Sequence, residues 1–201
     1  MESLLGRLPG IGPRQARRFV YFLLGDKTGL AGEIASLLSR LGEDVSQCPN
    51  CRRFFPRVEG SKPCGICLNV DGLRDQALLM IVEKDVDLES VERAGVFRGS
   101  YFVLGGLLPI LEKNPPSKIR LSDLDRLLNQ RVKSGKLEIV LALSANLEGD
   151  HTAEFLEEYL RNKFGEKITV SFLGRGLSTG TELEYSDRDT LLYALKNRGS
   201  R

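Results

Sequence analysis

The chain has 201 residues, of which 41% are hydrophobic and 28% charged, and its formal net charge is +2. This composition is typical of a folded globular protein of one large or two to three small domains, and no apolar run approaches the roughly 20 residues of a membrane helix. The first residues lack the pattern of a secretory signal, so we expect a cytoplasmic protein. Because the net charge is near zero, nucleic-acid binding would depend on local patches of charge.

Residues 1–47 are predicted to be helical. Two apolar runs recur with helical spacing, at Ala16–Leu23 and Leu30–Leu41, and residues 25–29 separate them. The string LPGIGPRQARR spans the start of the first run. Its two glycines, Gly10 and Gly12, can adopt positive φ and let a phosphate approach the backbone, and the proline that follows is suited to the first turn of a helix.

Three arginines, Arg14, Arg17 and Arg18, follow this glycine-rich turn. Arg14 and Arg18 share one face of the expected helix, whose first-turn N–H groups can hold a phosphate oxygen. The pattern resembles a helix-hairpin-helix motif, which implies sequence-independent DNA contacts through Gly10, Gly12 and the arginines. An ordinary helical corner with solvated arginines is the alternative.

All four cysteines of the chain form two C-x-x-C pairs separated by twelve residues. They are Cys48, Cys51, Cys64 and Cys67. Each pair can lie on a tight turn that points both thiols at one ion, and Asn50 and Gly65 suit the strained backbone of such turns. The spacing predicts a structural Zn²⁺ site of four thiolates, with the metal supplying folding energy that so short a segment cannot obtain from a core. A redox pair or free thiols are the alternatives.

From about residue 76, strand-like and helix-like segments alternate. Strands are expected at Leu78–Glu83, Tyr101–Leu104, Leu137–Leu143 and Ile168–Leu173. Helices are expected at Asp85–Ala94, Asp123–Ser134 and Thr152–Phe164, with a last helix near Asp187–Arg198. This order predicts a mostly parallel sheet covered on both faces.

Acidic residues follow two of these strands. Glu83 ends the first strand, and residues 144–150 follow the strand at 137–143, so both groups are expected at the carboxyl edge of the sheet. The arrangement resembles a Toprim domain, in which active members hold magnesium with a Glu after one strand and a D-x-D after a later one. Ser144 and Asn146 stand where those two aspartates would be, which implies a protein without this catalysis. Solvated acidic loops, or weak metal binding by the remaining carboxylates, stay open.

The chain as a whole resembles the RecR family of recombination proteins. The strings that carry the resemblance are LPGIGPRQARR, the CxxC…CGIC run followed by Arg74-Asp75, Ile81-Val82-Glu83, GSYFVLGG at 99–106, and the tail at 174–185. One departure occurs at residues 107–120, LLPILEKNPPSKIR, where the family has a loop rich in Ser, Pro, Asp and Gly. The role of that segment is therefore left unassigned.

The resemblance implies an α+β protein built of four parts. They are a helix-hairpin-helix DNA-binding domain at 1–47, a four-cysteine zinc module at 48–75, a Toprim-like α/β domain with a parallel sheet at 76–173, and a helical C-terminal segment at 174–201.

The implied function is that of a DNA-binding mediator without enzymatic activity. Such proteins act with a RecO-type partner, and sometimes a RecF-type partner, to load a RecA-type recombinase onto single-stranded DNA at gaps, and they are similar to a homo-oligomeric ring of four subunits. Repeating weak contacts around a ring raises avidity. Four carboxylates then become candidates for docking a basic partner: Glu83, Asp85, Glu148 and Asp150.

Two rival functions come from other classes. The first is a working Toprim nuclease or topoisomerase, which a magnesium-dependent cleavage assay detects. The second is a transcription or translation factor that reads RNA or protein through the zinc module, which a sequence-competition binding assay detects.

Overall fold

The computed structural model of the chain describes residues 1–110, 118–177, 180 and 182–198. Half of the unassigned segment at 107–120, residues 111–117, therefore lies outside the described residues. The chain divides into two compact units, one formed by Met1–Ser46 with Phe55–Gly60 and the other by Gln47–Phe54 with Ser61–Arg201. Among the helices described, none combines the length and apolar character needed to cross a membrane. The four-part division at 47, 75 and 173 stays a prediction.

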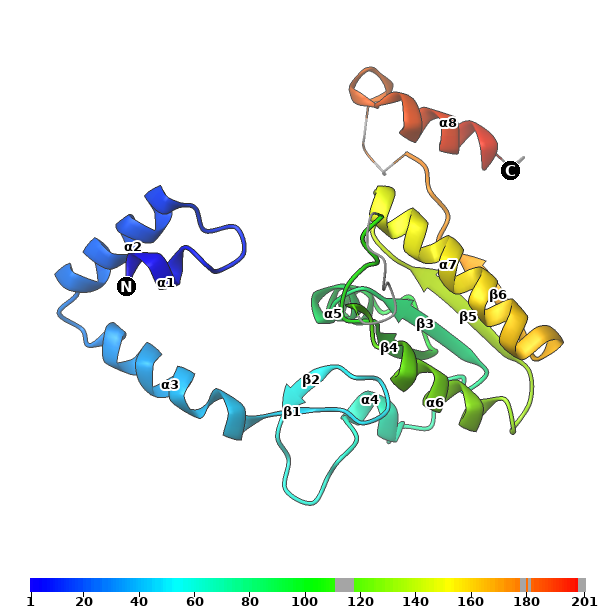
Figure 1. Cartoon of the computed structure of the whole chain (residues 1–201), viewed down its shortest axis with the longest axis horizontal. Coiled ribbons are helices and arrows are strands. Elements are labelled where there is room, and N and C mark those ends of the chain that lie inside the picture. Colours follow the sequence, from blue (N-terminus) through cyan, green and yellow to red (C-terminus); the bar gives the residue numbers. More distant parts are fainter. Residues whose placement is uncertain (111–117, 178–179, 181, 199–201) are drawn as a thin grey trace. The chain divides into compact units, whose positions relative to one another are not determined.

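The first unit contains three helices, α1 (Glu2–Leu5), α2 (Pro13–Gly25) and α3 (Leu30–Asp44) (Figure 1). The two predicted helical runs are thus confirmed. Helix α2 begins where expected because its first residue is proline, whose missing N–H has no intrahelical partner to lose. Helix α3 follows Gly29 in the left-handed conformation (φ 87°), which ends the connection between the two helices.

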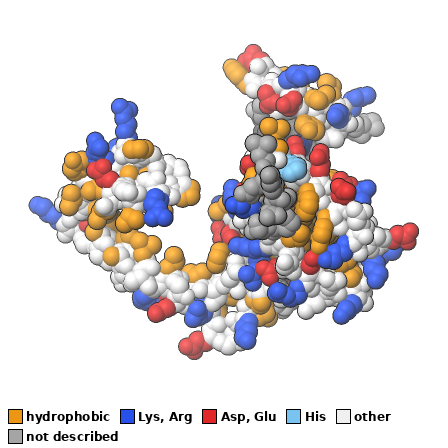
Figure 2. All heavy atoms as spheres, in the orientation of Figure 1, with side chains coloured by type: hydrophobic (Ala, Val, Ile, Leu, Met, Phe, Trp, Pro, Cys, Tyr) orange, Lys and Arg blue, Asp and Glu red, His pale blue; other side chains and the backbone are white. Residues whose placement is uncertain are grey.

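Apolar side chains lie at the surface of this unit. Ala16 is the one buried residue of α2, and α3 has none. Tyr21, Phe22 and Leu37 are each more than 60% exposed, and Figure 2 shows hydrophobic side chains gathered over these helices. So much exposed apolar surface on helices is unusual for a chain that acts alone.

The cysteine-containing segment holds three short elements. Strands β1 (Val45–Gln47) and β2 (Phe54–Pro56) pair in a two-stranded sheet, and the single-turn helix α4 (Gly65–Leu68) carries the second C-x-x-C pair. These elements are too small to enclose an apolar core, as the sequence predicted.

A four-stranded parallel sheet forms the centre of the second unit, with the strand order β4-β3-β5-β6. The strands are β3 (Leu78–Val82), β4 (Ser100–Val103), β5 (Leu137–Ala142) and β6 (Ile168–Phe172). The predicted parallel sheet is confirmed, and each strand lies within one residue of its expected bounds. In register, Ile81 of β3 faces Phe102 on one side and Leu141 on the other.

Helices cover both faces of this sheet (Figure 1). They are α5 (Asp85–Ala94), α6 (Leu121–Arg131) and α7 (Leu147–Phe164). Leu79 and Ile81 point into a core that includes buried leucines of α6 and α7, such as Leu124 and Leu156. The alternate residues of β3 point to the other face, where they pack with Leu88 of α5. Side chains alternate along a strand, so one apolar run serves both cores.

Helix α7 corrects one expected boundary. It begins at Leu147 rather than at residue 152, because the Asn146 side chain accepts a hydrogen bond from the Gly149 amide (2.8 Å) and caps the helix. A helix that began at residue 152 would leave residues 144–150 in a loop, but Glu148 and Asp150 lie in the first turn of α7. Gly149 is closely packed there: a Cβ at this position would lie 1.8 Å from the Ser144 carbonyl oxygen.

Three short helices lie on either side of the last strand, β6. A 3-10 turn, η2 (Gly165–Lys167), precedes β6, and η3 (Leu183–Tyr185) precedes the last helix, α8 (Arg188–Lys196). Asp187 caps α8 by accepting hydrogen bonds from the amides of residues 189 and 190, both at 2.9 Å. The predicted C-terminal helix is confirmed, with ends within two residues of those expected.

Candidate metal centre, phosphate turn and acidic edge

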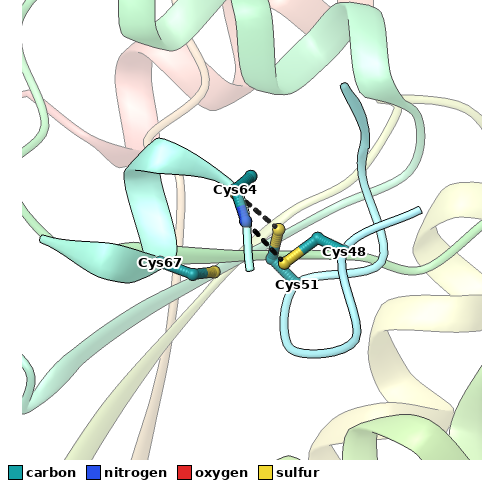
Figure 3. Close-up of side chains that lie close together, drawn as sticks. All are labelled: Cys48, Cys51, Cys64 and Cys67. Carbon is teal, nitrogen blue, oxygen red and sulfur yellow. Dashed lines mark hydrogen bonds between the residues drawn. The ribbon is translucent and has the colours of Figure 1, made fainter. Parts of the chain in front are cut away.

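The structure brings all four cysteines together. Their sulfur atoms lie within 4.8 Å of one another (Figure 3). The Cys64 amide donates to Cys48 Sγ at 3.4 Å, and the sulfurs of Cys51 and Cys64 are 3.6 Å apart. A tetrahedral ion with metal–sulfur bonds of about 2.3 Å requires its sulfurs to be about 3.8 Å apart. The cluster can therefore bind a metal ion with little change of side-chain position.

Burial and charge also suit a metal ligand set. Cys48, Cys51 and Cys64 are buried, and Cys67 is half-buried. Thiol hydrogen bonds from Cys51, and then from Cys64 and Cys67, lower the pKa of Cys48, while the same contact with Cys48 raises the pKa of Cys51. The thiols thus interact with one another through close contacts, as convergence on one position requires.

The strained turns of the two pairs fall at other residues than expected. Asn50 and Gly65 do not have positive φ; Arg52 (φ 64°) and Asn69 (φ 49°) do. In the first turn the Arg52 amide donates to the Cys48 carbonyl at 3.0 Å, so the turn spans residues 49–51 and its left-handed residue directly follows the second cysteine. The sequence prediction was wrong because it placed the strain inside the C-x-x-C spacing.

The first cysteine pair is attached to the sheet by backbone contacts. Val103 of β4 donates its amide to the Cys51 carbonyl at 2.8 Å. Arg120 donates to the Arg52 carbonyl at 3.0 Å, and the Arg52 side chain forms an ion pair with Asp123 of α6 (3.2 Å). The loop that carries Cys48 and Cys51 is therefore built onto β4 and α6.

The glycine-rich turn directly precedes α2, and most of its residues are exposed. The Ile11 amide donates to the Leu8 carbonyl at 3.1 Å, and Gly10 has φ 75°, as predicted. Gly12 has φ −80° and is the N-cap of α2, so the expectation of positive φ there was wrong. An N-cap residue has extended backbone, which any residue can adopt.

The three arginines of α2 are all exposed. Arg17 forms an ion pair with Glu2 (3.4 Å). No ion pair joins Arg14 or Arg18 to a carboxylate of the described residues. Residues 7–18 contain four arginines and no acidic residue, so this turn is a local basic patch in a chain of nearly neutral charge. It can hold a phosphate backbone through side chains and helix N–H groups together.

Glu83 lies at the carboxyl end of β3 and is buried, with 5% of its surface exposed. Ser144 donates its hydroxyl to one carboxylate oxygen, and Lys84 Nζ lies 2.6 Å from the other. Burial by itself would raise the pKa of Glu83, but the hydrogen bonds from Lys84 and Ser144 outweigh it, and the pKa lies below its usual value. Each carboxylate oxygen of Glu83 thus has one protein partner.

The other acidic candidates have different surroundings. Asp85 accepts a hydrogen bond from the Phe54 amide at 2.7 Å and so helps to anchor the cysteine loop. Asp150 forms a two-bond ion pair with Arg175. Glu148 is exposed, and its carboxylate has no ion-pair partner among the described residues. Of the four carboxylates, Glu148 is the one most available to a partner.

Two ion-pair partners of the acidic candidates, Lys84 and Arg175, were not predicted from the sequence. Lys84 directly follows Glu83, but adjacency along a strand end does not indicate an ion pair. Arg175 is 25 residues from Asp150, and its guanidinium also lies over the Tyr193 ring, 5.2 Å from the centroid. No spacing rule connects residues so far apart, because the packing of β6 and the tail against α7 creates the contact.

Comparison with known proteins gives two results. The Toprim domain matches residues 77–174. A protein named Recombination protein RecR from Novosphingobium aromaticivorans is 38% identical over 198 residues, covering 98% of this chain and 94% of that protein. Proteins of the same name from Phenylobacterium zucineum and Rhodospirillum rubrum are 38% and 39% identical, each covering 98% of this chain and 92% and 93% of their own lengths.

Proposed function

The chain belongs to the RecR family of recombination proteins, and from this premise we propose that it is a DNA-binding mediator that helps to load a RecA-type recombinase onto gapped or single-stranded DNA. The observation that carries the proposal is the likeness over nearly the whole chain, which includes the glycine-rich turn and both cysteine pairs. Loading requires DNA and other repair proteins, so we place its work in the cytoplasm.

The proposed metal is Zn²⁺. Four sulfur donors within 4.8 Å of one another match a closed tetrahedral zinc site, which is structural because it has no open position for a substrate. Bound there, the ion would contribute folding energy to a segment whose elements are three or four residues long.

The proposed DNA contacts are made by Gly10, Gly12 and the three arginines of α2. The exposed helix N-terminus and the absence of ion pairs at Arg14 and Arg18 among the described residues support phosphate binding. Such contacts carry no sequence information, so binding is expected to depend on salt and not on base sequence.

We propose that the Toprim domain of this chain does not catalyse strand cleavage. By the resemblance to Toprim domains, Ser144 and Asn146 stand where active members have aspartates, and the Asn146 side chain caps α7. Glu83 accepts hydrogen bonds from Lys84 and Ser144. Phosphoryl-transfer chemistry needs an ion that neutralises developing charge, and these contacts leave little of a site for it.

The proposed partners are a RecO-type protein, and also a RecF-type protein, together with copies of the chain itself in a ring of four. Glu148, exposed at the start of α7, supports docking of a basic partner by complementary charge. Exposed apolar side chains on α2 and α3 support self-association.

The decisive experiment is a loading assay. Gapped DNA is covered with single-strand binding protein, and the ATPase of a RecA-type recombinase reports filament formation in the presence of a RecO-type protein. Adding this chain is expected to shorten the lag before ATP hydrolysis. The same lag with and without the chain, when the partner is present and active, contradicts the proposal.

A further inference from the structure

The loop that carries Cys48 and Cys51 is a short segment between two strands of three residues each, β1 and β2. Within it, the Cys48 amide donates to the Arg53 carbonyl at 2.8 Å, and the Arg52 amide donates to the Cys48 carbonyl at 3.0 Å. A loop that becomes ordered only when an ion binds lowers the affinity, because fixing its backbone costs conformational entropy. Contacts that hold this loop beforehand are therefore expected to strengthen metal binding.

Arg120 makes such a contact from a position 68 residues beyond the loop residue that it binds. It is half-buried and directly precedes α6. Its Nη1 atom donates to the Arg52 carbonyl at 3.0 Å and to the Val103 carbonyl at 3.1 Å. Arg52 directly follows Cys51, and Val103 is the last residue of β4. The guanidinium therefore bridges the cysteine loop and the end of a strand, through hydrogen bonds that its charge strengthens.

The end of β4 fixes both the loop and the arginine. The Val103 amide donates to the Cys51 carbonyl at 2.8 Å, while the Val103 carbonyl accepts from Arg120. The Arg120 backbone is held as well, because its amide donates to the Leu104 carbonyl at 2.9 Å. Gly105 leaves room for the guanidinium, since a Cβ at this position would lie 2.8 Å from Arg120 Nε. Three consecutive residues, 103–105, thus set the position of the Arg120 side chain.

We propose that Arg120 is a positioning residue of the metal site, which holds the first cysteine pair against the end of β4 before the ion binds. The inference rests on the proposed zinc. It gives a role to the last residue of the segment 107–120, in which the chain departs from the family's loop. The loop acceptor, Arg52, adjoins the first pair, whereas the second pair is carried by α4. The effect of Arg120 is therefore expected to be greater at the first pair.

An arginine that only stabilises the fold would have a different effect on the cysteines. Its loss would increase global unfolding, which exposes all four thiols to the same extent. Loss of positioning instead opens the first pair locally and leaves the second pair, Cys64 and Cys67, better protected. The two roles are therefore separated by which thiols become reactive.

The experiment follows zinc and thiols together in the full zinc-loaded chain. Zinc transfer to a chromogenic chelator gives the release rate, and mass spectrometry gives the rate at which iodoacetamide alkylates each cysteine. Arg120→Gln removes the charge and the guanidinium, whereas Arg120→Lys keeps the charge without the planar fork of donors. Arg161→Gln, which replaces an exposed arginine of α7, is the matched control. Circular dichroism of each variant reports folding separately.

Arg120→Gln is expected to release zinc about 10-fold faster, at the lower end of the usual effect of a residue that supports metal ligands. Alkylation of Cys48 and Cys51 is expected to rise more than that of the second pair. Arg120→Lys is expected to lie between Arg120→Gln and the wild type, and the control to match the wild type.

Wild-type release and alkylation in a folded Arg120→Gln overturn the inference, and so does an equal rise at all four cysteines. If Arg120→Gln does not fold, wild-type behaviour of Arg120→Lys overturns it. A wild type that binds no zinc overturns the proposed cofactor together with this inference, whereas bound zinc that is insensitive to Arg120 overturns the inference alone.

Discussion

At Glu83, the carboxylate that would be the first metal ligand of an active Toprim site is held by protein groups. Lys84 lies 2.6 Å from one oxygen, and the Ser144 hydroxyl bonds the other. A lysine ammonium supplies one positive charge where magnesium would supply two, and it cannot polarise a phosphate by direct coordination. This residue therefore contributes to the stability of the sheet edge.

The Glu83 contacts predict a pH dependence of stability. The pKa of Glu83 in the folded protein lies below its unfolded value, which is about 4.3. Its stabilisation is therefore fully present above that pH and is lost as the pH falls through the folded pKa. Glu83→Gln is expected to lower the free energy of unfolding by about 1–2 kcal/mol at pH 7, and the difference from the wild type is expected to shrink below pH 4.

Denaturant titrations at several pH values measure this difference. Glu89→Gln, on the exposed face of α5, is the control. A difference that stays constant down to pH 3 contradicts the role given to the Glu83 charge.

The same Glu83→Gln variant also tests for catalysis. The wild type is expected to show no magnesium-dependent DNA cleavage. Cleavage by the wild type that is lost in Glu83→Gln would show that the site is active.

The cysteines make a second prediction at this scale. Because the four thiols converge on one position, the purified protein is expected to carry one zinc per chain, and Cys64→Ser is expected to lose it. Elemental analysis measures the metal, and proteolysis of residues 48–67 reports the loosening that should follow. Full zinc content in Cys64→Ser would falsify the four-cysteine site.

Among the elements, α2 and the turn before it combine rigidity with charge. Gly12 caps the helix, Pro13 begins it, and the arginines project from its first two turns. Because Ala16 is the one buried residue of α2, replacing the arginines is not expected to disturb packing. The DNA function of this element can therefore be tested without loss of the fold.

The double variant Arg14→Ala/Arg18→Ala is expected to bind all DNA sequences more weakly. Each arginine releases counterions when it meets a phosphate, so the plot of log affinity against log salt should become shallower by about one unit for each phosphate that is no longer neutralised. A salt titration of DNA binding measures this. The control replaces Arg126 and Arg161, which are exposed and already paired with Asp123 and Glu157. An unchanged affinity and slope in a correctly assembled variant means that the turn is a structural corner.

At the scale of the whole molecule, the proposed ring explains how so small a basic patch can bind DNA. One turn with four arginines binds weakly, and repetition around a ring raises the effective concentration of the remaining contacts after the first forms. The exposed aromatic and aliphatic side chains of α2 and α3 are the surface that association can bury.

Light scattering across a range of protein concentrations tests the assembly. We expect a mass of four chains at high concentration, falling as the protein is diluted. The Arg14→Ala/Arg18→Ala variant is expected to give the same masses, since it keeps the apolar residues of α2. A single-chain mass at every concentration contradicts the proposed ring of four chains.

The sequence by itself was enough to predict the helices, the strands and the cysteine ligands, because these depend on local patterns. Helical spacing located α2 and α3, apolar runs located the four strands, and the spacing of the cysteines identified the residues that converge. Each of these patterns acts over a few residues or is a fixed chemical spacing, so it can be seen without a fold. The family resemblance followed from the same strings.

Only the tertiary structure decided which side chains meet. The start of α7 depends on the Asn146 cap, and the left-handed residue of the first cysteine turn is Arg52 and not Asn50. The pairing of Asp150 with Arg175, and of Glu83 with Ser144, joins residues 25 and 61 positions apart. These contacts follow from the pairing of parallel strands, which brings distant segments to one edge of the sheet. No local pattern of the sequence contains that information.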